Sequence, residues 1–467
     1  MSTGALIQLE SKNEFDDLLF SNDIETSEFK YNLKKTTNFS EVPYSFYPSG
    51  SVSWGDKLTF KINKFGDLMT NMYLALELPE ISVTDIIGKN EDPVTSNYRV
   101  KWLDYIGYVI IENAVLRIGG KKIQEMSGEY MMCYSDLYDN NWCNMALHGH
   151  DGNLIQPQLK IFKQYIYVPL RFFNCGNYNT SLPVNALRYQ EIEVEIKLRS
   201  WESVYLVLQQ LTDVKDEHGL NIDIDSYRYA HTHDKLPQMS FNNIRLDCNF
   251  IFLESFERES FLREKQEILI TQVQSVNQTC THTDSIYLNF TNPIREFYFL
   301  LSKSNIRDLG EIFNYSGRPN FIPFDENGNE ITRFTKSLWV QIPEKHLLEN
   351  ASLLFNNVER VPIKDYKYWY LVQNYETFKS KPDHFIYLYS FGLMAKRYNV
   401  GSCNFSEIDN VKLNISLADS DIRRFSLEYP NYLVQLGPED STFISVYGVN
   451  YNVFIIEEGM SELMYGM

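Results

Sequence analysis

The sequence predicts an all-β protein built from two β-sandwiches or jelly rolls in tandem. Short runs of strand-forming residues recur along the chain, and turns rich in Gly, Asn and Asp separate them. The composition is 44% hydrophobic and 15% aromatic, mainly Tyr and Phe, which favour strands. Because 467 residues are too many for one hydrophobic core, two domains of roughly 200 residues each are expected.

The boundary between the two domains is predicted near the middle of the chain. Asn249 to Leu253 is an apolar run of strand formers, and alternation resumes from Glu267 to Val273. Between them, the charged stretch Glu257 to Lys265 predicts two exposed helical turns with Ser255 as a candidate N-cap. We therefore divide the chain into an N-terminal arm (1–25), a first jelly-roll domain (26–258), a connector (259–266) and a second jelly-roll domain (267–467).

The N-terminal arm contains one short predicted helix, Asn13 to Phe20. Phe15, Leu18 and Leu19 lie on one side of it. A helix of this length is unstable alone, so it must dock on its own body or on a neighbour.

In the first domain the clearest predicted helix is Ser127 to Tyr138, capped by Ser127, with its apolar residues at helical spacing. A hairpin is expected around the Gly66-Asp67 turn, and a second around Gly119-Gly120, because two glycines supply the positive φ of a tight turn. The other predicted strands and loops are as follows: strands over 108–118, 121–124, 161–170 and 190–200, and loops over 81–100 and 140–159.

The second domain is expected to repeat this style. Its predicted strands are Ile286–Phe290, Arg295–Leu301, Leu338–Ile342, Tyr368–Val372, Phe385–Leu393, Val411–Leu417 and Phe443–Ile456. Long polar loops separate them, and such loops are a usual place for partner contacts.

Charge and hydropathy exclude several classes of function. The net charge of −18 disfavours direct nucleic-acid binding, which needs a basic face. No apolar run of about 18 residues predicts a membrane span, and the N-terminus does not resemble a signal peptide, so a cytosolic product is expected. The six cysteines have no CxxC pair and are expected to be free buried thiols.

No catalytic, cofactor-binding or metal-binding residues are predicted, and the chain is not expected to be an enzyme. Cys143, His148 and His150 lack the paired spacing of a zinc site, so solvated loop histidines are expected, as for His231 and His233. The carboxylates of Glu191, Glu193 and Glu195 alternate with apolar residues. This alternation is typical of the wet face of a strand rather than of acid/base chemistry.

Five parts of the chain carry a resemblance to a known family. They are ALIQLESK with TTNFSEVPYSF and WGDKLTFKINKFGDLMTNMYLALELP; WLDYIGYVIIENAVLRIGGKKIQEMSGEYMMCYSDL; IYVPLRFFNCGNYNTSLPVNALRYQEIEVEIKLRSWE; FLESFERESFLREKQEILITQVQ; and IYLYSFGLMAKRYNVGSCNFSEIDNVKL with VYGVNYNVFIIEEGMSELMYGM. They extend over nearly the whole chain and resemble the major capsid proteins of nucleocytoplasmic large DNA viruses.

The resemblance implies a double jelly roll, which is two eight-stranded antiparallel β-sandwiches in tandem with a few short helices. It further implies a homotrimer that forms a pseudo-hexagonal capsomer and contacts neighbouring capsomers in the icosahedral shell of a large double-stranded DNA virus. The arm would lie beneath the capsomer, near minor capsid proteins and an inner virion membrane. The protein would be located in the virion and assembled in the host cytoplasm.

Two alternatives remain open. The first is a related double jelly-roll minor capsid or scaffold protein, favoured by the acidic and polar segment SNDIETSEFKYN. The second is a β-sandwich carbohydrate-binding protein, for which Tyr366, Tyr368, Trp369 and Tyr370 would supply a stacking surface. Aromatic runs in β proteins are more often buried in the core.

Overall fold

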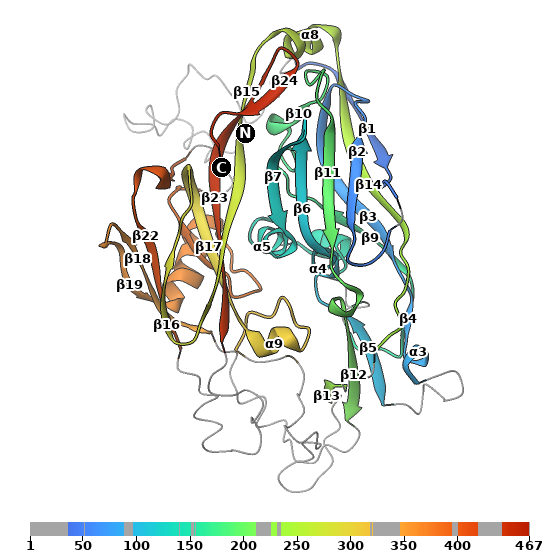
Figure 1. The fold of residues 1–467 in the computed structure, drawn as a ribbon, viewed down its shortest axis with the longest axis vertical. Helices are drawn as coiled ribbons and strands as arrows, with labels where there is room; N and C mark the ends of the chain where they lie inside the picture. The colour runs from blue at the N-terminus through green and yellow to red at the C-terminus, as the bar shows by residue number, and fades with distance from the viewer. Residues whose placement is uncertain are drawn as a thin grey trace, which may run out of the picture.

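The computed structural model describes residues 36–50, 52–87, 97–139, 141–150, 154, 156–211, 226–230, 235–317, 320, 346–394, 400–418 and 441–466. In this part of the chain two β-sandwiches stand side by side, and all strand pairs are antiparallel (Figure 1). The predicted arm helix, the strand Leu338–Ile342 and the pair His231 and His233 lie outside the described residues.

The first sandwich has two main sheets. One sheet has the order β1 (Phe39–Phe46), β14 (Asn242–Leu253), β3 (Leu68–Leu78) and β10 (Leu182–Pro183), with β9 (Gln164–Pro169) also paired to β3. The other has the order β2 (Lys57–Ile62), β11 (Ile192–Leu198), β6 (Ile111–Ile118) and β7 (Lys121–Ser127). Two small sheets extend it at the end remote from the connector: β13 (Ser226–Tyr229), β12 (Tyr205–Leu211) and β5 (Tyr98–Trp102); and β4 (Ile81–Ser82) with β8 (Lys160–Ile161).

The second sandwich is built in the same way. Its first sheet has the order β15 (Gln266–Cys280), β23 (Thr442–Glu457), β17 (Pro293–Lys303) and β20 (Tyr387–Ser390), with short strands β21 (Cys403–Asn404) and β24 (Met460–Leu463) added. Its second sheet has the order β16 (Thr283–Tyr287), β22 (Val411–Leu417), β18 (Leu348–Phe355) and β19 (Val358–Asp365).

The two sandwiches share one strand order. When the two small sheets and the short strands β10, β21 and β24 are set aside, each sandwich has eight strands among the described residues, which pair in the order first, eighth, third, sixth in one sheet and second, seventh, fourth, fifth in the other. Eight antiparallel strands in two such sheets form a jelly roll. The chain is therefore a double jelly roll, as the sequence predicts.

The junction has the predicted strand, helix and strand. β14 ends at Leu253, α8 covers Ser255–Arg263, and β15 begins at Gln266. Glu254 rather than Ser255 is the N-cap residue, and α8 buries none of its residues. Figure 1 shows α8 crossing one end of the molecule between the two sandwiches. The domain limits drawn from the sequence stay a prediction.

The remaining helical segments are short. They are α3 (Thr84–Ile87), α4 (Ile106–Ile110), α5 (Gly128–Tyr138), α6 (Trp142–Leu147), α9 (Ser304–Asp308), α11 (Gln373–Phe378), the π-helix η3 (Tyr368–Val372), and the 3-10 turns η1 (Tyr178–Thr180), η2 (Trp201–Ser203) and η4 (Phe405–Glu407). The helix Ser127 to Tyr138 is thus confirmed, including its cap, because the Ser127 side chain accepts a hydrogen bond from the Tyr130 backbone N–H.

Several local predictions are wrong. The loop predicted over 81–100 contains β4, α3 and the start of β5, and the strand predicted from 108 begins as helix α4. The loop predicted over 140–159 contains α6, which Asn141 caps by accepting from the Asn144 backbone N–H. The segment Tyr368–Val372, predicted as a strand, is the π-helix η3. The carboxylate of Asp365, just before it, accepts a hydrogen bond from the Tyr368 backbone N–H at 3.2 Å.

The hairpin of β18 and β19 was not predicted. Its turn is Asn356-Asn357, and both residues adopt positive φ angles of 50° and 62°. Asn tolerates this conformation, so the pair takes the place of the Gly-containing turn that usually marks a hairpin in a sequence.

Candidate functional site

Strands β17 and β23 are buried on both faces, and they join the two sandwiches. On β17, Phe297 and Phe299 point into the core of the second sandwich, whereas Tyr298 and Leu300 belong to the core that fills the first. On β23, Ile444 and Val446 belong to the core of the second sandwich, whereas Tyr447 and Val449 belong to the core that fills the first. The two sandwiches therefore share one continuous packed interface, which is the candidate functional site of the chain.

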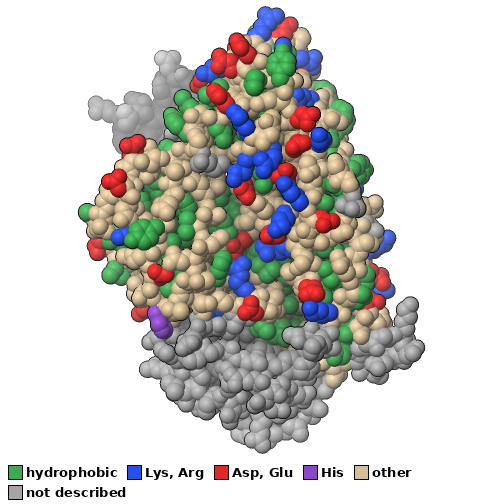
Figure 2. Space-filling model, in the orientation of Figure 1, with side chains coloured by type: hydrophobic (Ala, Val, Ile, Leu, Met, Phe, Trp, Pro, Cys, Tyr) green, Lys and Arg blue, Asp and Glu red, His purple; other side chains and the backbone are tan. Residues whose placement is uncertain are grey.

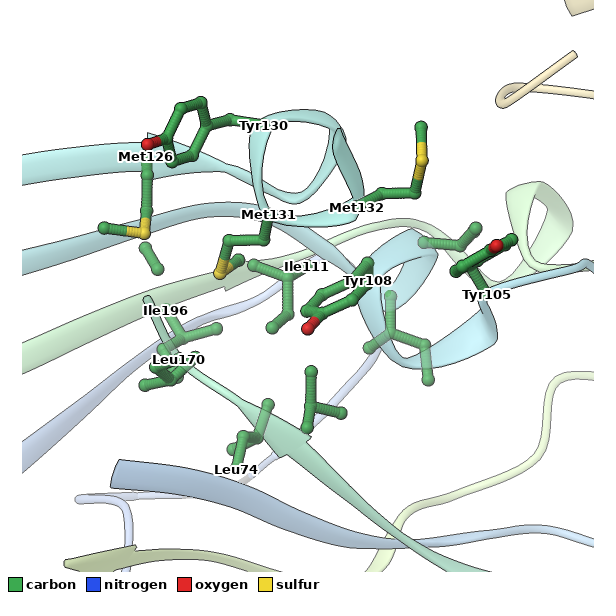
Figure 3. Close-up of a cluster of buried hydrophobic side chains, with 14 of the residues drawn as sticks. Leu74, Tyr105, Tyr108, Ile111, Met126, Tyr130, Met131, Met132, Leu170 and Ile196 are labelled. Carbon is green, nitrogen blue, oxygen red and sulfur yellow. The ribbon is translucent and has the colours of Figure 1, made fainter. Parts of the chain in front are cut away.

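Helix α5 fills the space between the sandwiches. It belongs to the first sandwich, and all but one of its eleven residues are buried. Figure 3 shows Met131 directed at Ile111 and Ile196 on the first-sandwich side, whereas Tyr130 points away from them. The Tyr130 ring stacks on Tyr298 of β17, with 5.8 Å between ring centroids.

The carboxylate of Glu129, in the first turn of α5, forms hydrogen bonds to the second sandwich. It accepts hydrogen bonds from the hydroxyls of Tyr315 at 3.0 Å, Ser445 at 3.0 Å and Tyr447 at 2.6 Å. Burial, followed by the charge of Glu129, raises the pKa of both tyrosines well above its usual value. Both hydroxyls therefore stay protonated and remain donors.

Asp136 makes the second contact from the same helix. Its carboxylate accepts from the backbone N–H groups of Asp383 and His384, each at 2.9 Å, and lies 3.1 Å from Nδ1 of His384. The Asp136 side chain is fully buried. Hydrogen bonds between an ionised acceptor and backbone donors are stronger than neutral ones, so Asp136 fixes this loop of the second sandwich.

A buried triad lies at the C-terminal end of α5. Arg295 Nη2 lies 2.8 Å from Glu296 Oε1, and the Tyr138 hydroxyl bonds to both side chains. Burial disfavours the charge on Arg295, but Glu296 and Tyr138 outweigh it and raise the arginine pKa. The opposite charges of Arg295 and Glu296 thus offset each other in the interior, and removal of either side chain would leave the other as an unpaired buried charge.

Amide side chains join β7 to β15 nearer the connector. Gln272 Nε2 donates to the Ile123 carbonyl at 2.6 Å, and its Oε1 accepts from Asn452 Nδ2 at 2.8 Å. In return, Gln124 Nε2 donates to the Thr271 carbonyl at 3.2 Å. The amides of Gln124, Gln272 and Asn452 are each paired through both of their polar atoms, so this part of the interface is polar and its amides are satisfied.

Sequence reasoning did not identify these interface residues. One signal was available: Glu129 and Asp136 are seven residues apart and therefore lie on the same face of an otherwise apolar helix. A second was the run Arg295 to Leu301, in which five consecutive apolar residues follow one another without polar alternation. Such a run is typical of a strand that is buried on both faces.

The prediction that the loop histidines are solvated is wrong for His148. Its side chain is fully buried. Tyr105 stacks on both His148 and His150, with centroid distances of 5.2 Å and 4.3 Å, and contacts His384 edge-on. Burial, followed by the charges of His150 and Arg171, lowers the pKa of His148 to about 3. This imidazole is a neutral packing group at neutral pH.

Acidification is therefore expected to destabilise the fold through His148. The unfolded chain binds a proton below a pKa of 6.5, while the folded chain does so only near 3, so stability falls as pH drops through this window. Between pH 7 and pH 5 the loss is about 2 kcal/mol. Denaturant titrations at several pH values would measure it.

His148→Phe, which keeps an aromatic ring between Tyr105 and Tyr108, should flatten this pH dependence, whereas the same change at the exposed His282 should not. An unchanged slope in His148→Phe would contradict the assignment.

The three glutamates of the run Gln190 to Ser200 have a structural role. Glu195 pairs with Lys57 at 3.0 Å and Arg117 at 2.9 Å, and Lys61 lies between Glu191 and Glu193, so these carboxylates form the charged outer face of β11, as expected.

The aromatic cluster does not form an exposed row. Trp369 and Tyr370 are buried in the second core, and Tyr366 and Tyr368 are half-buried.

All six cysteines are free thiols. Cys133, Cys248 and Cys280 are buried, Cys175 and Cys403 are half-buried, and Cys143 is exposed, contrary to expectation. Among the described residues, no group of three or more His, Cys, Asp or Glu side chains is placed to hold a metal ion. In the same part of the chain, no helix combines the length and the apolar character needed to cross a membrane.

Comparison with known proteins gives consistent matches over the full length. The major capsid protein of Paramecium bursaria Chlorella virus 1 is 25% identical, with 99% of each chain covered, and that of Phaeocystis pouchetii virus is 23% identical, also with 99% of each covered. A chain of the quasi-atomic model of the PBCV-1 virus capsid superposes with a TM-score of 0.69 at 22% identity, covering 94% of this chain and 100% of that chain. The Faustovirus major capsid protein superposes with a TM-score of 0.67 at 11% identity, covering 97% and 96%.

The models of two protein families match consecutive parts of the sequence. Residues 27–254 match the major capsid protein N-terminus, and residues 257–461 match the large eukaryotic DNA virus major capsid protein. Together with the shared fold, these matches show that the chain belongs to the major capsid protein family of large eukaryotic DNA viruses.

Proposed function

We propose that three copies of this chain form a homotrimeric capsomer, and that such capsomers tile the icosahedral shell of a large DNA virus. The chain is a structural capsid protein of the virion and not an enzyme. The observation that carries the proposal is the pair of jelly rolls with one strand order, held together by a buried interface.

The geometry of the pair supports this assembly. Three chains with two similar sandwiches each place six similar lobes around a three-fold axis, which gives a nearly hexagonal outline that can tile a surface. This arrangement requires the two sandwiches of one chain to keep a fixed relation. The contacts of Glu129, Asp136 and Gln272 across the interface provide that rigidity.

The outer surface suits many weak contacts between capsomers. Figure 2 shows positive and negative side chains intermixed on the visible face, without a large field of one sign. Contacts of this kind are individually weak, but they become strong when a shell repeats them many times.

We further propose that the connector end, where β1 begins, faces the interior of the particle. Minor capsid proteins and an inner membrane would lie on that side, and assembly would take place in the host cytoplasm. The net charge of −18 supports the absence of direct genome binding.

Electron microscopy of the purified full-length chain tests the proposal. The expected class averages show three-fold particles with six lobes. Particles with only two lobes, or with two-fold symmetry at every concentration tried, would contradict it.

A further inference from the structure

A groove lies at the connector end of the molecule, beside α8 and between the loop that contains η1 and the start of β15. Its volume is about 370 Å³, within the range of sites that bind ligands or peptides. One wall is the polar loop Asn177–Ser181, and the other is formed by Gln266–Leu269 at the start of β15. Leu68 and Phe261 complete the lining.

The apolar lining of this groove includes Leu68, which is buried, and Phe261, which is half-buried. Leu68 packs with Ile251, Leu253 and Phe261 in a small cluster that is separate from the main core. Beside it, Ile268 and Leu269 are only half-buried, although β15 is paired with β23 along its whole length. An apolar surface of this kind inside a polar rim is typical of a docking site.

Strand β1 begins at this same end. Phe39, the first residue of β1, pairs with Leu253, which is two residues before α8 begins. Its side chain is 62% exposed. The part of the chain before β1 is therefore connected at the end of the molecule that holds the groove.

We propose that the arm segment Asn13–Phe20 of the same chain docks in this groove. Its sequence matches the surface, because Phe15, Leu18 and Leu19 lie on one side of the predicted helix and three acidic residues lie on the other. The apolar side would cover the apolar lining, and the acidic side would face the polar wall and solvent. This proposal does not depend on trimer formation.

The length of the arm allows this docking. Eighteen residues separate Phe20 from Phe39, and in an extended conformation they span at most about 60 Å. A tether this short keeps the segment at an effective concentration on the order of millimolar. The arm of the same chain therefore has an advantage over a neighbour's arm or another protein.

A competition experiment tests the proposal with the full-length protein. The probe is a fluorescent synthetic peptide of residues 1–25, and its binding is followed by anisotropy. In the wild-type protein the tethered arm occupies the groove, so the peptide should bind weakly. In the variant Leu18→Asp/Leu19→Asp the arm is released, and the peptide should bind at least about ten times more tightly.

Two further variants locate the binding site. Adding Leu269→Arg to the released-arm protein should abolish peptide binding, whereas adding Val358→Arg, on an exposed strand of the second sandwich, should not. A peptide that itself carries the two Asp substitutions should not bind, and this control leaves the protein body unchanged.

The outcomes are distinct. Equal peptide binding to wild-type and released-arm proteins, or no binding to either, overturns the proposal. If the wild-type protein gains peptide binding when it is diluted, a neighbouring copy supplies the arm, and the same-chain assignment is wrong. The mass of the released-arm protein reports separately on the trimer.

Discussion

Gly128→Ala is expected to destabilise the protein by about 3 kcal/mol or more, because overpacking against fixed atoms cannot relax. A Cβ at Gly128 would lie 2.1 Å from the carbonyl oxygen of Tyr108 and 2.2 Å from that of Ile111. Both oxygens are backbone atoms of the buried α4 and β6, so α5 would have to move off the first sandwich. Denaturant unfolding of the purified protein measures the effect.

Gly392→Ala is the matched control. There the nearest atom to a new Cβ is the carbonyl oxygen of Gly401 at 3.4 Å, an ordinary contact, so the change should stay within about 0.5 kcal/mol. Similar stabilities for both variants would show that α5 does not sit as close to α4 as described.

Asp136→Ala is expected to loosen the second sandwich from the first. Two backbone N–H groups, of Asp383 and His384, would lose their acceptor, and the loss of such charged hydrogen bonds costs about 2–4 kcal/mol. Hydrogen exchange should accelerate first at residues 383–386, before the strands of either sandwich are affected. Mass spectrometry of exchanged peptides gives this readout directly.

A surface carboxylate provides the comparison for Asp136. Glu259 on α8 pairs with Arg263 at 2.9 Å in an exposed position, and its replacement by Ala should cost less than about 0.5 kcal/mol. If Asp136→Ala left exchange at 383–386 unchanged, the interface would not depend on this contact.

Local sequence patterns were sufficient for most of the strands and for α5. The strand β11 shows why: Glu191, Glu193 and Glu195 alternate with buried Ile and Val, and the structure places the carboxylates outside. Alternation with period two reports directly on the two faces of a sheet. The cap at Ser127 is equally local.

The wrong predictions concern residues whose structure is determined by tertiary contacts and not by the local sequence. Trp369 and Tyr370 are residue types that favour strands, but both lie in a helix and both are buried. In a strand with one buried face, successive side chains point to opposite faces, so two neighbours would not both be buried. His148 follows a loop-like sequence, and tertiary packing between Tyr105 and Tyr108 buries it. The partners of Glu129 lie in the other sandwich, up to 318 residues away, so no local pattern could name them.

The mass of the full-length chain in solution, measured by light scattering at low micromolar concentration and moderate salt, tests the central claim most directly. A stable species near three times the chain mass of 54.9 kDa is the result predicted for the capsomer. A monomer that persists as the concentration rises would contradict it.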